Sequence, residues 1–453
     1  MLQGQKSGGT VLEKVSSAPL TEGTDPLPRW FTEAQTEAQK EFEQEPYPNR
    51  KDELWRFSSV KNLVLDGYRP ARSIQKPGVD GVLHRGFPRP AGRMVFVNDQ
   101  LVSCELFDES LREQGLLFLT LEQAAQARPD LLQTHFMTQA ARLGSKKFVA
   151  FHKASVKAGT VLYVPPKLVV DAPFEVFHVV ASENVTVFPH TLIIADEGSQ
   201  VTFLDHFLSL DTSSERRTPD AERRTQNGKG FACGVNDLVL KPDSKLTYIS
   251  VQDWSRQFVS IQVNSTLAEK NAAAVNLSLN FGGRYSRLES ISRLVGSGAR
   301  SDMLAISVAG TDQEFDQRTL QDHLQPDTTS DLLYKNSLTD NARTIFSGLI
   351  KVERGAHRTD AYQKVRNLVL SDEAEANSMP GLEILADDVR CTHGATSGQV
   401  EPEELFYMLS RGIPEKQAKA LIVNGFLNEV IDRLPAVDMR TYLRDRLSER
   451  LSN

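Results

Sequence analysis

The sequence predicts a mainly β protein whose core is a parallel β-helix, or solenoid, flanked by N-terminal and C-terminal α-helical regions. The first observation is a series of short runs of β-branched and aromatic residues between residues 147 and 398, each bounded by turn-forming residues. The second is a small or polar corner that recurs before these runs. The third is the lack of tight hairpin signals, which the competing architecture, a β-sandwich, would be expected to show.

The chain divides into three predicted parts. Its 453 residues are about three times the length of a typical domain. Residues 1–146 are predicted to form a mainly helical N-terminal region, residues 147–398 the parallel β-helix core, and residues 399–453 a C-terminal helical domain. A hydrophobic content of 40% and a charged content of 25% are ordinary for a globular protein.

The N-terminal region contains two predicted helical stretches with a β segment between them. Strong helix formers fill "PRWFTEAQTEAQKEFEQE", which ends at the breaker "PYPNR", and a second helical stretch spans residues 119–143. The segment "RMVFVNDQLVSCEL" predicts the β element. In "DELWRFSSVKNL" we interpret Trp55 and Phe57 as packing anchors, because large aromatic side chains dominate core energetics.

The predicted strands of the core begin with "KFVAFHKA" at residues 147–154. Stacked coils of a solenoid bury one continuous core that no single coil can bury alone. The corners are separated by about one or two multiples of 20 to 23 residues. They are Gly198-Ser199, Asp243-Ser244, Asn271-Ala272, Gly298-Ala299 and Asn341-Ala342. Residues 211–230, rich in charge and turn formers, are predicted to form a surface loop.

Three helices are predicted after residue 401. The segment 402–434 opens with Pro402 and acidic residues, as helix N-termini do, and "SRGIP" breaks it into two helices. The segment "MRTYLRDRLSERLSN" predicts a third, amphipathic helix. Apolar residues recur at helical spacing in the first two: Leu405, Phe406, Leu409, Ala418, Leu421, Ile422, Phe426 and Val430. Such a tail can cap the solenoid or dock a partner.

Composition and missing motifs argue against several function classes. The net charge of −7 disfavours nucleic-acid binding, and no apolar run reaches the roughly 20 residues of a membrane helix. The sequence does not begin with a secretory pattern, and its three distant cysteines fit a reducing compartment, so we expect a cytoplasmic protein. No P-loop, GxGxxG, HExxH or GxSxG motif occurs, so neither a bound nucleotide nor a catalytic residue is predicted.

Five histidines are weaker candidates for ligands. His178, His190 and His206 lie in or beside strand runs and would form a ligand cluster only if they stack. Isolated core or ladder histidines are the more common outcome for such positions. His323 and His357 lie in polar surroundings, and the same interpretation applies to them.

The stretch "CTHGATSGQV" places Cys391 and His393 two positions apart. If residues 387–393 are extended, both side chains project from the same face of the strand. Neutral imidazole and thiolate are both iron ligands, although an ordinary thiol must first lose its proton. The spacing alone leaves three interpretations open: a metal site, a catalytic pair, or ordinary residues at the end of a strand.

Several motifs together carry a resemblance to a known family. They are "FSGLIKV", "TDAYQ", "LVLSDEAEANSMPGLEI", "CTHGAT" and "LFYMLSRGI", with "DELWRFSS", "VLYVPPKLVVDAPFEV", "PHTLIIADEGSQVTF" and "SVQDW" earlier in the chain. With these motifs the sequence resembles the SufB/SufD family of iron–sulfur cluster assembly proteins. It is more similar to the SufD branch, because Gly394 stands where SufB-like chains carry an acidic residue and "LVLSDEAEANSMPG" lacks a cysteine.

The resemblance implies a right-handed parallel β-helix and the role of a non-catalytic scaffold subunit in the SUF system. A SufD-like chain pairs with a SufB-like paralogue, and each binds one SufC-like ABC-type ATPase in a SufBCD complex. The complex builds a nascent iron–sulfur cluster and passes it to carrier proteins. In this picture ATP hydrolysis belongs to the SufC-like partner.

The resemblance also implies site residues. His393 would hold the nascent cluster at the subunit interface, opposite a SufB cysteine, and Cys391 is a second candidate ligand. Since such clusters normally take four protein ligands, the site would be transient and shared with the partner. The C-terminal helices would carry the SufC contact, with these predicted partner-binding residues: Leu405, Phe406, Tyr407, Arg411, Gly412, Ile413, Ile422 and Phe426.

Two other functions stay open at this point. A secreted-type β-helix carbohydrate-active enzyme would need two carboxylates about 5 to 9 Å apart. A purely structural partner subunit would keep the interfaces without any cluster ligation. When the paralogue is missing, an exposed β-helix edge would also favour a homodimer.

Overall fold

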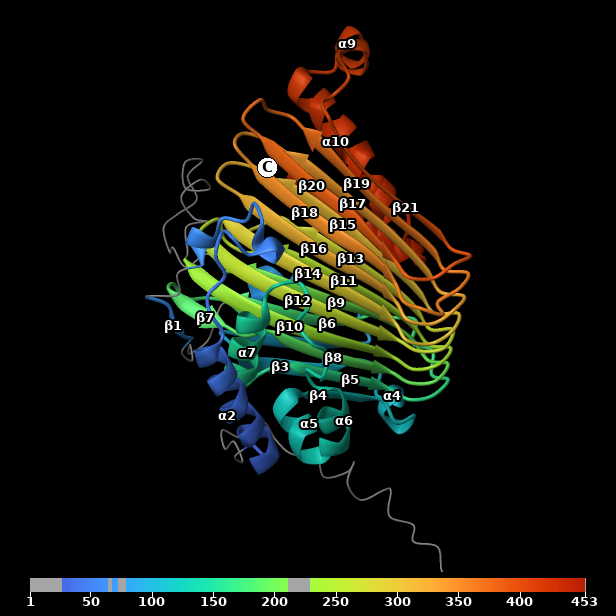
Figure 1. Cartoon of the computed structure of the whole chain (residues 1–453). Coiled ribbons are helices and arrows are strands. Elements are labelled where there is room, and N and C mark those ends of the chain that lie inside the picture. Colours follow the sequence, from blue (N-terminus) through green and yellow to red (C-terminus); the bar gives the residue numbers. More distant parts are fainter. Residues whose placement is uncertain (1–26, 64–66, 72–78, 211–228, 453) are drawn as a thin grey trace, which may run out of the picture.

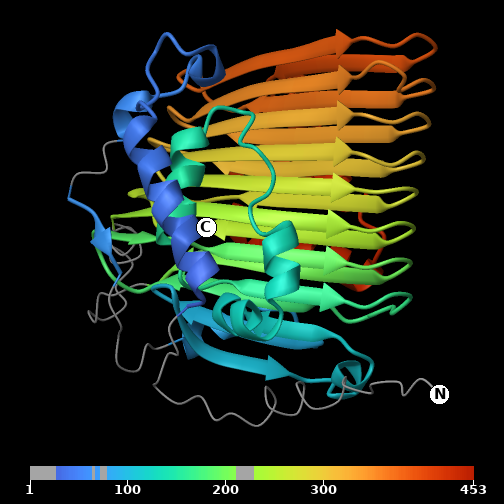
Figure 2. The same ribbon diagram turned by 60° about the horizontal axis from the view of Figure 1, so that its bottom comes forward.

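The structure, a computed structural model, describes residues 27–63, 67–71, 79–210 and 229–452. These residues form a parallel β-solenoid of about 8 turns, with helices at its N-terminal and C-terminal ends (Figures 1 and 2). The predicted mainly β class and solenoid are therefore confirmed. Residues 211–228 of the predicted surface loop lie outside the described residues.

Two sheets form the walls of the solenoid, and most turns contribute one strand to each. Sheet A contains β4 (Leu117–Thr120), β5 (Thr160–Val164), β8 (His190–Ala195), β10 (Gly230–Leu240), β12 (Phe258–Ala268), β14 (Tyr285–Leu294), β16 (Glu314–His323), β18 (Arg343–Val352) and β20 (Glu375–Ile384). The short strands β1 (Arg69–Pro70) and β7 (Val185–Val187) join its edge near β10.

Sheet B is built in the same way. It contains β3 (Gln100–Leu106), β2 (Gly92–Val97), β6 (Phe174–Val180), β9 (Gln200–Ser209), β11 (Lys245–Asp253), β13 (Ala273–Asn280), β15 (Arg300–Ala309), β17 (Thr329–Leu338), β19 (Asp360–Val369) and β21 (Arg390–Gly398). All named pairs are parallel except β2 with β3 and β4 with β5. The β segment predicted before residue 107 is thus a hairpin that extends sheet B.

The solenoid turns are longer than the corner spacing predicted. From β10 onward, the shortest register step pairs Val259 with Tyr285, and the longest pairs Arg343 with Glu375. Both steps are longer than one predicted interval of about 20 to 23 residues and shorter than two, so the predicted spacing of the turns is wrong. The reason is that one turn holds two strands of about ten residues and two connections, whereas the prediction allowed for shorter strands.

The predicted corners do mark the turns. Asp243, Asn271 and Gly298 adopt left-handed backbone angles, with φ of +60°, +55° and +75°. Asn, Asp and Gly tolerate this region better than other residues, which explains their recurrence at one corner of the stack. At the predicted corner Asn341-Ala342 the left-handed residue is the preceding Asp340.

Helices cover both ends of the chain. The structure has α2 (Arg29–Gln44), η1 (Glu53–Trp55), η2 (Val60–Asn62), α3 (Asp80–Leu83), α4 (Ser110–Glu113), α5 (Leu121–Ala127), α6 (Pro129–His135), α7 (Lys146–Ser155), α9 (Pro402–Ser410), α10 (Glu415–Ile431) and α11 (Val437–Ser452). The helical stretch predicted at 119–143 is two short helices divided at Pro129, which can begin a helix but not continue one. The three predicted C-terminal helices are confirmed.

The strand predicted at residues 147–154 is wrong, because this segment forms helix α7. Its aromatic side chains at positions 148 and 151 are three residues apart, which places them on one side of the helix, and both pack in the same apolar cluster. Phe148 is fully buried against the outer face of sheet A, and Phe151 stacks on Phe42 of α2 with ring centroids 4.7 Å apart. Contact with α2, which lies far away in sequence, therefore decides the conformation.

The two outer faces of the solenoid are covered by different helices (Figure 2). The N-terminal helices bury the outer face of sheet A, where Phe148 packs among Phe231 and Val259. Helices α10 and α11 cover sheet B, where Leu427 and Leu443 pack on the outward-facing strand residues. These form a row that the register aligns: Leu204, Ile249, Leu277, Leu304 and Leu333.

The interior between the sheets contains a polar network as well as an apolar core. Gln317 donates to Ser307 at 2.8 Å and to Asn336 at 3.0 Å, which connects the two sheets. Asn336 in turn donates to Asn367 at 2.8 Å in the next turn. Buried amides of this kind need such partners, and the chain of bonds continues toward the C-terminal turn.

The helices also bear on the expectation about membranes. Among the residues that the structure describes, no helix is long and apolar enough to cross a membrane.

Candidate functional site

The solenoid ends in an open turn. Within the described part of the chain, β20 is hydrogen-bonded only to β18, and β21 only to β19. Every residue of β16 is buried, whereas β21 contains no buried residue. Figure 1 shows β20 and β21 at the end of the stack beyond which α9 projects. One edge of each terminal strand therefore remains available for pairing.

Cys391 and His393 lie on this last turn and share one face. The register places Cys391 beside Ala361 and His393 beside Gln363. Ala361 and Gln363 are buried inside the solenoid, and neighbours in a ladder point the same way, so both candidate ligands face inward. His393 is nevertheless exposed, because no described strand covers β21.

Cys391 is the more enclosed of the two. Its side chain is half-buried and packs against an apolar cluster that includes Ile350 and Val352. Burial raises the pKa of the Cys391 thiol, and the nearby carboxylate of Asp360 raises it further. The thiol is therefore protonated at neutral pH and must release a proton before it can bind iron.

The surroundings of His393 are open. The opposite face of the strand is open as well, because a Cβ atom added at Gly394 or Gly398 would meet no described atom within 4 Å apart from its chain neighbours. Beneath His393, the Gln363 side-chain oxygen is buried and has no hydrogen-bond partner among the residues that the structure describes. The imidazole thus stands where a second molecule can approach it.

One interior amide connects the two terminal strands. Asn367 donates to Ser378 of β20 at 3.2 Å and to Ser397 of β21 at 3.1 Å. It accepts at the same time from Asn336 in the preceding turn. These bonds fix the spacing of β20 and β21 although no later turn holds them in place.

The described part of this chain does not provide a complete metal site by itself. In the described ranges, no group of three or more His, Cys, Asp or Glu side chains could hold a metal ion. Cys391 and His393 are two ligand groups on one strand, and an iron–sulfur cluster normally takes four protein ligands. A cluster at this end therefore requires ligands from another molecule.

Helix α9 presents apolar side chains to solvent. It has no buried residue, and Phe406 and Tyr407 are 72% and 60% exposed. Leu409 and Leu421 are exposed as well, although they were not among the predicted partner-binding residues. An apolar surface of this kind on an end helix is typical of a protein-binding site.

The other predicted partner-binding residues are placed around this surface. Leu405, Ile413 and Ile422 are partly buried, whereas Arg411 and Gly412 are exposed. Arg411 lies over the Tyr407 ring at 5.2 Å, and Gly412 has a φ of +81°, which permits the sharp turn between α9 and α10.

Phe426 differs from the rest of the predicted set, because it belongs to the packing of α10 on sheet B. The Lys335 ammonium lies 4.4 Å from the centre of its ring and donates to its carbonyl oxygen at 2.6 Å. We therefore expect Phe426 to hold α10 in place rather than to lie at the centre of a contact.

The other histidines do not gather into a ligand cluster. His178 pairs with Asp205 on the inner face of sheet B, and His206 shares a 2.9 Å hydrogen bond with Glu175 on the outer face. His190 lies outside sheet A beside α7, 3.3 Å from a buried histidine at position 152. These residues are core and ladder histidines.

His323 and His357 are also separate. His323 is buried between Thr328 and Ser330, at 2.8 Å from each hydroxyl, so its surroundings are polar, as expected, and lie in the interior of the solenoid. His357 is exposed at a corner and bonds to the carbonyl of Asp387.

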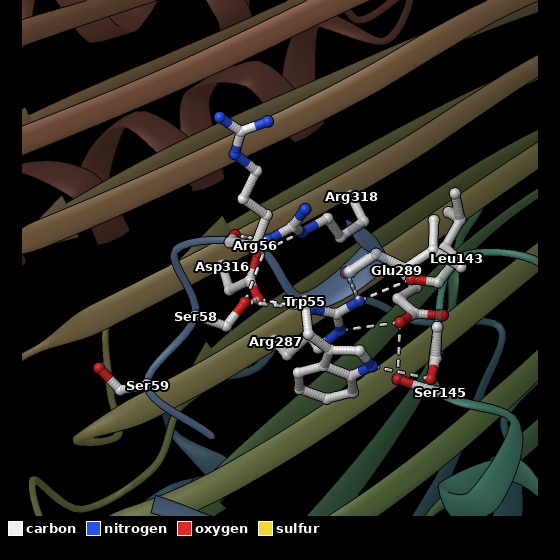
Figure 3. Close-up of polar contacts among 12 residues, drawn as sticks. Trp55, Arg56, Ser58, Ser59, Leu143, Ser145, Arg287, Glu289, Asp316 and Arg318 are labelled. Carbon is white, nitrogen blue, oxygen red and sulfur yellow. Dashed lines mark hydrogen bonds and ion pairs between the residues drawn. The ribbon is translucent and has the colours of Figure 1, made fainter. Parts of the chain in front are cut away.

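The predicted N-terminal anchors behave differently from each other. Residues 53–59, which we call the strap, cross the outer face of sheet A (Figure 3). Trp55 is only 2% exposed and lies over Arg287, with the guanidinium carbon 3.7 Å from the ring centre, so its anchor role is confirmed. Phe57 is 42% exposed with a φ of +67°, so its predicted packing role is wrong. The left-handed backbone turns its ring outward.

A buried ion cluster beneath the strap was missed by sequence reasoning. Arg287 donates to Glu289 at 2.8 Å and to Asp316 at 2.5 Å (Figure 3). Arg318 donates to the second oxygen of Asp316 at 2.6 Å, and the strap hydroxyl of Ser58 completes the set. Burial alone would raise the pKa of Asp316, but the two arginines outweigh it and hold the pKa low.

A signal for this cluster does exist in the sequence. Arg287 and Glu289 lie two residues apart, and so do Asp316 and Arg318, which places each opposite-charge pair on one face of its strand. The missing information was the register that stacks the two pairs, which depends on the length of each turn.

These features define a class: a parallel β-solenoid protein with an unpaired terminal turn, an exposed apolar end helix and a partial ligand set. The family model described as "SUF system FeS cluster assembly, SufBD core domain" matches residues 178–426. The model described as "SufBD protein N-terminal region" matches residues 25–176. The chain belongs to the SufBD family of iron–sulfur cluster assembly proteins.

Individual relatives agree with this assignment. "Iron-sulfur cluster assembly protein SufD" of Bacillus subtilis (strain 168) is 26% identical over 423 residues, covering 92% of this chain and 93% of the relative. SufBD family proteins of Staphylococcus saprophyticus and Staphylococcus aureus (strain MRSA252) are also 26% identical, over 74% of this chain and 70% of each relative. The predicted resemblance to SufD is confirmed.

Proposed function

We propose that this chain is the SufD-like scaffold subunit of a cytoplasmic SUF-type assembly complex. In the proposal, its open end pairs with a SufB-like paralogue, and the nascent cluster forms at that junction. The observation that carries it is the position of His393, exposed on the inward face of an unpaired terminal strand. Family membership supports the assembly function, and the open end supports the pairing.

The chemistry of the site suits temporary binding. His393 would supply one neutral nitrogen ligand, and the partner would supply the ligands that this chain lacks. Cys391 is a second candidate ligand, but its raised pKa means that it would bind only after losing a proton to solvent or to a partner base. With few ligands from each side, separation of the chains would release the cluster to a carrier protein.

The exposed face of α9 and α10 is proposed as the contact for a SufC-like ATPase. Phe406, Tyr407, Leu409 and Leu421 would form its apolar centre, with Arg411 beside them. In this account the ATPase hydrolyses ATP, while this chain performs no catalysis of its own.

Two alternatives can be compared with the proposal. The family match favours cluster assembly over a carbohydrate-active enzyme. A purely structural partner subunit would keep the open end and α9 but would not need His393. Replacing His393 therefore separates the two alternatives, because cluster binding would need its imidazole and a purely structural role would not.

The experiment is co-expression with candidate SufB-like and SufC-like chains, followed by purification without oxygen. Iron and acid-labile sulfide are measured for the wild type, His393→Ala and the control His357→Ala, an exposed corner histidine. We expect all three complexes to assemble, with iron and sulfide strongly reduced only in His393→Ala. Unchanged iron would leave a structural subunit, and absence of any complex would contradict the scaffold proposal.

A further inference from the structure

Charged side chains on the outer face of sheet A form rows in which the sign alternates from turn to turn. One row runs through Glu314, Arg343 and Glu375, which the register places side by side. Arg343 lies 3.3 Å from the Glu314 carboxylate and 3.1 Å from the Glu375 carboxylate. The basic group is thus held between acidic groups of the turns before and after it.

A second row lies further along the same strands. It runs through Arg293, Asp322, Lys351 and Glu383. Arg293 lies 3.2 Å from Asp322, and Lys351 lies 3.8 Å from Glu383. Opposite charges directly across neighbouring strands stabilise a sheet, and like charges there destabilise it. The alternating charges therefore stabilise the register in which each strand pairs with its neighbours.

Both rows end on an acidic residue at the free edge of β20. The Glu375 and Glu383 side chains are 57% and 48% exposed, and among the described residues each has a basic neighbour only on the side of β18. The middle of β20 between them is uncharged, with Met379 at its centre. The next strand in the stack would continue both rows if it carried two basic side chains at the spacing that Arg343 and Lys351 have in β18.

We propose that Glu375 and Glu383 are specificity determinants of the open end, which select a partner strand with basic residues at that same spacing and reject a second copy of this chain. The inference rests on the proposed function, in which the open end pairs with a paralogue. It adds the chemistry of the strand that pairs with β20: this strand belongs to a partner protein and carries basic residues opposite Glu375 and Glu383, not acidic ones.

Self-pairing brings the like charges together. If β20 of two copies meets in an antiparallel arrangement centred on Met379, Glu375 of each copy faces Glu383 of the other. Opposite residues in such a pair project from the same face, so two carboxylate–carboxylate contacts form. The homodimer expected from an exposed edge would therefore have to use β21 or another register.

Charged residues on an edge strand can also serve only to prevent aggregation. That role needs repulsion between copies but no attraction to any partner. The two roles differ for the neutral variant Glu375→Gln/Glu383→Gln. A purely protective role predicts more self-association with partner affinity unchanged or higher, whereas a specificity role predicts more self-association together with weaker binding of the partner.

The first test uses the SufB-like paralogue. Its affinity is measured for the wild type, the Gln variant, the reversed variant Glu375→Lys/Glu383→Lys, and the control Glu33→Lys/Glu37→Lys on exposed α2. We expect roughly a tenfold loss for the Lys variant, a smaller loss for the Gln variant and none for the control. If the wild type fails to bind, the proposed pairing fails. If wild type and Lys variant bind equally, only this inference is overturned.

The second test needs no partner. Wild type and the Lys variant are each examined alone and then mixed in low salt by native mass spectrometry and sedimentation. In the mixture, the carboxylates of one copy face the introduced lysine side chains of the other, so we expect at least about fivefold more dimer than in either sample alone. The excess should disappear at about 1 M salt, where charges are screened within about 3 Å. A mixture that dimerises no more than its components overturns the inference.

Discussion

At the scale of single residues, Asp316 connects the ion cluster of sheet A to the strap of the N-terminal region. It accepts from Arg287, Arg318 and the strap hydroxyl of Ser58, all in a buried environment. Asp316→Asn removes the negative charge and leaves two buried guanidinium groups without full compensation. Removing one partner of a buried ion pair costs about 3 to 5 kcal/mol, so we expect a loss of that size in unfolding free energy.

Urea denaturation of the isolated chain measures this loss. The matched control is Asp372→Asn, in the exposed turn before β20, which should change the unfolding free energy by less than about 0.5 kcal/mol. A loss below about 1 kcal/mol for Asp316→Asn would mean that the ion cluster does not hold the strap.

His323 gives the fold a defined pH dependence. Burial lowers its pKa from the ordinary 6.5 to about 4. In the unfolded chain His323 therefore binds a proton near pH 6.5, whereas in the folded chain it does so only near pH 4. The folded state is consequently favoured above pH 6.5, and this part of the stability is lost as the pH falls from 6.5 to 4. Between pH 7 and pH 4, the wild type should lose about 3 kcal/mol more than His323→Gln.

The difference is measured from urea midpoints of both proteins across the pH range. His357→Gln, at an exposed corner, serves as the control and should follow the wild type. Parallel curves for the wild type and His323→Gln would show that His323 titrates normally in the folded protein.

At the scale of elements, α9 is exposed without contributing to the core, because it has no buried residue. Phe406→Asp and Tyr407→Asp should therefore leave the unfolding midpoint unchanged. In the same variants, binding of a SufC-like ATPase should weaken at least about tenfold, since apolar and aromatic centres dominate such contacts. Calorimetric titration with the ATPase and thermal unfolding measure the two effects.

A buried residue of the neighbouring helix provides the contrast. Leu427→Ala in α10 should lower the unfolding free energy by about 2 to 5 kcal/mol, because Leu427 is fully buried against sheet B. Unchanged ATPase binding in the α9 variants would contradict the assigned surface. A lowered unfolding midpoint of Phe406→Asp or Tyr407→Asp would instead show that α9 supports the fold.

Most elements could be predicted because their signals are local. Strand runs, left-handed corners such as Asn271 and the broken C-terminal helices all follow from residues close in sequence. Helix α7 could not, because its aromatic run fits both periods and its conformation depends on packing against α2. The placement of Cys391 and His393 on one strand was predictable, since it depends only on a spacing of two.

At the scale of the whole molecule, the unpredictable part is the register between turns. The length of the step differs from turn to turn, so the sequence alone does not align Glu314, Arg343 and Glu375, nor the pairs beneath the strap. In our proposal this alignment gives the residues of the charged rows their role, because alternating charges would stabilise the stack and place acidic groups at its end. The charge pattern of the open end therefore depends on the register of all the turns before it.

The central claim is that His393 binds iron in a site shared between two chains. The direct measurement is pulsed electron paramagnetic resonance on the reduced complex, reconstituted without oxygen from partners and from this chain labelled with 15N-histidine. We predict a 15N hyperfine coupling typical of a histidine ligand, which disappears in His393→Ala and persists in His357→Ala. A cluster signal without such a coupling in the wild type, or with the same coupling in His393→Ala, would contradict the account.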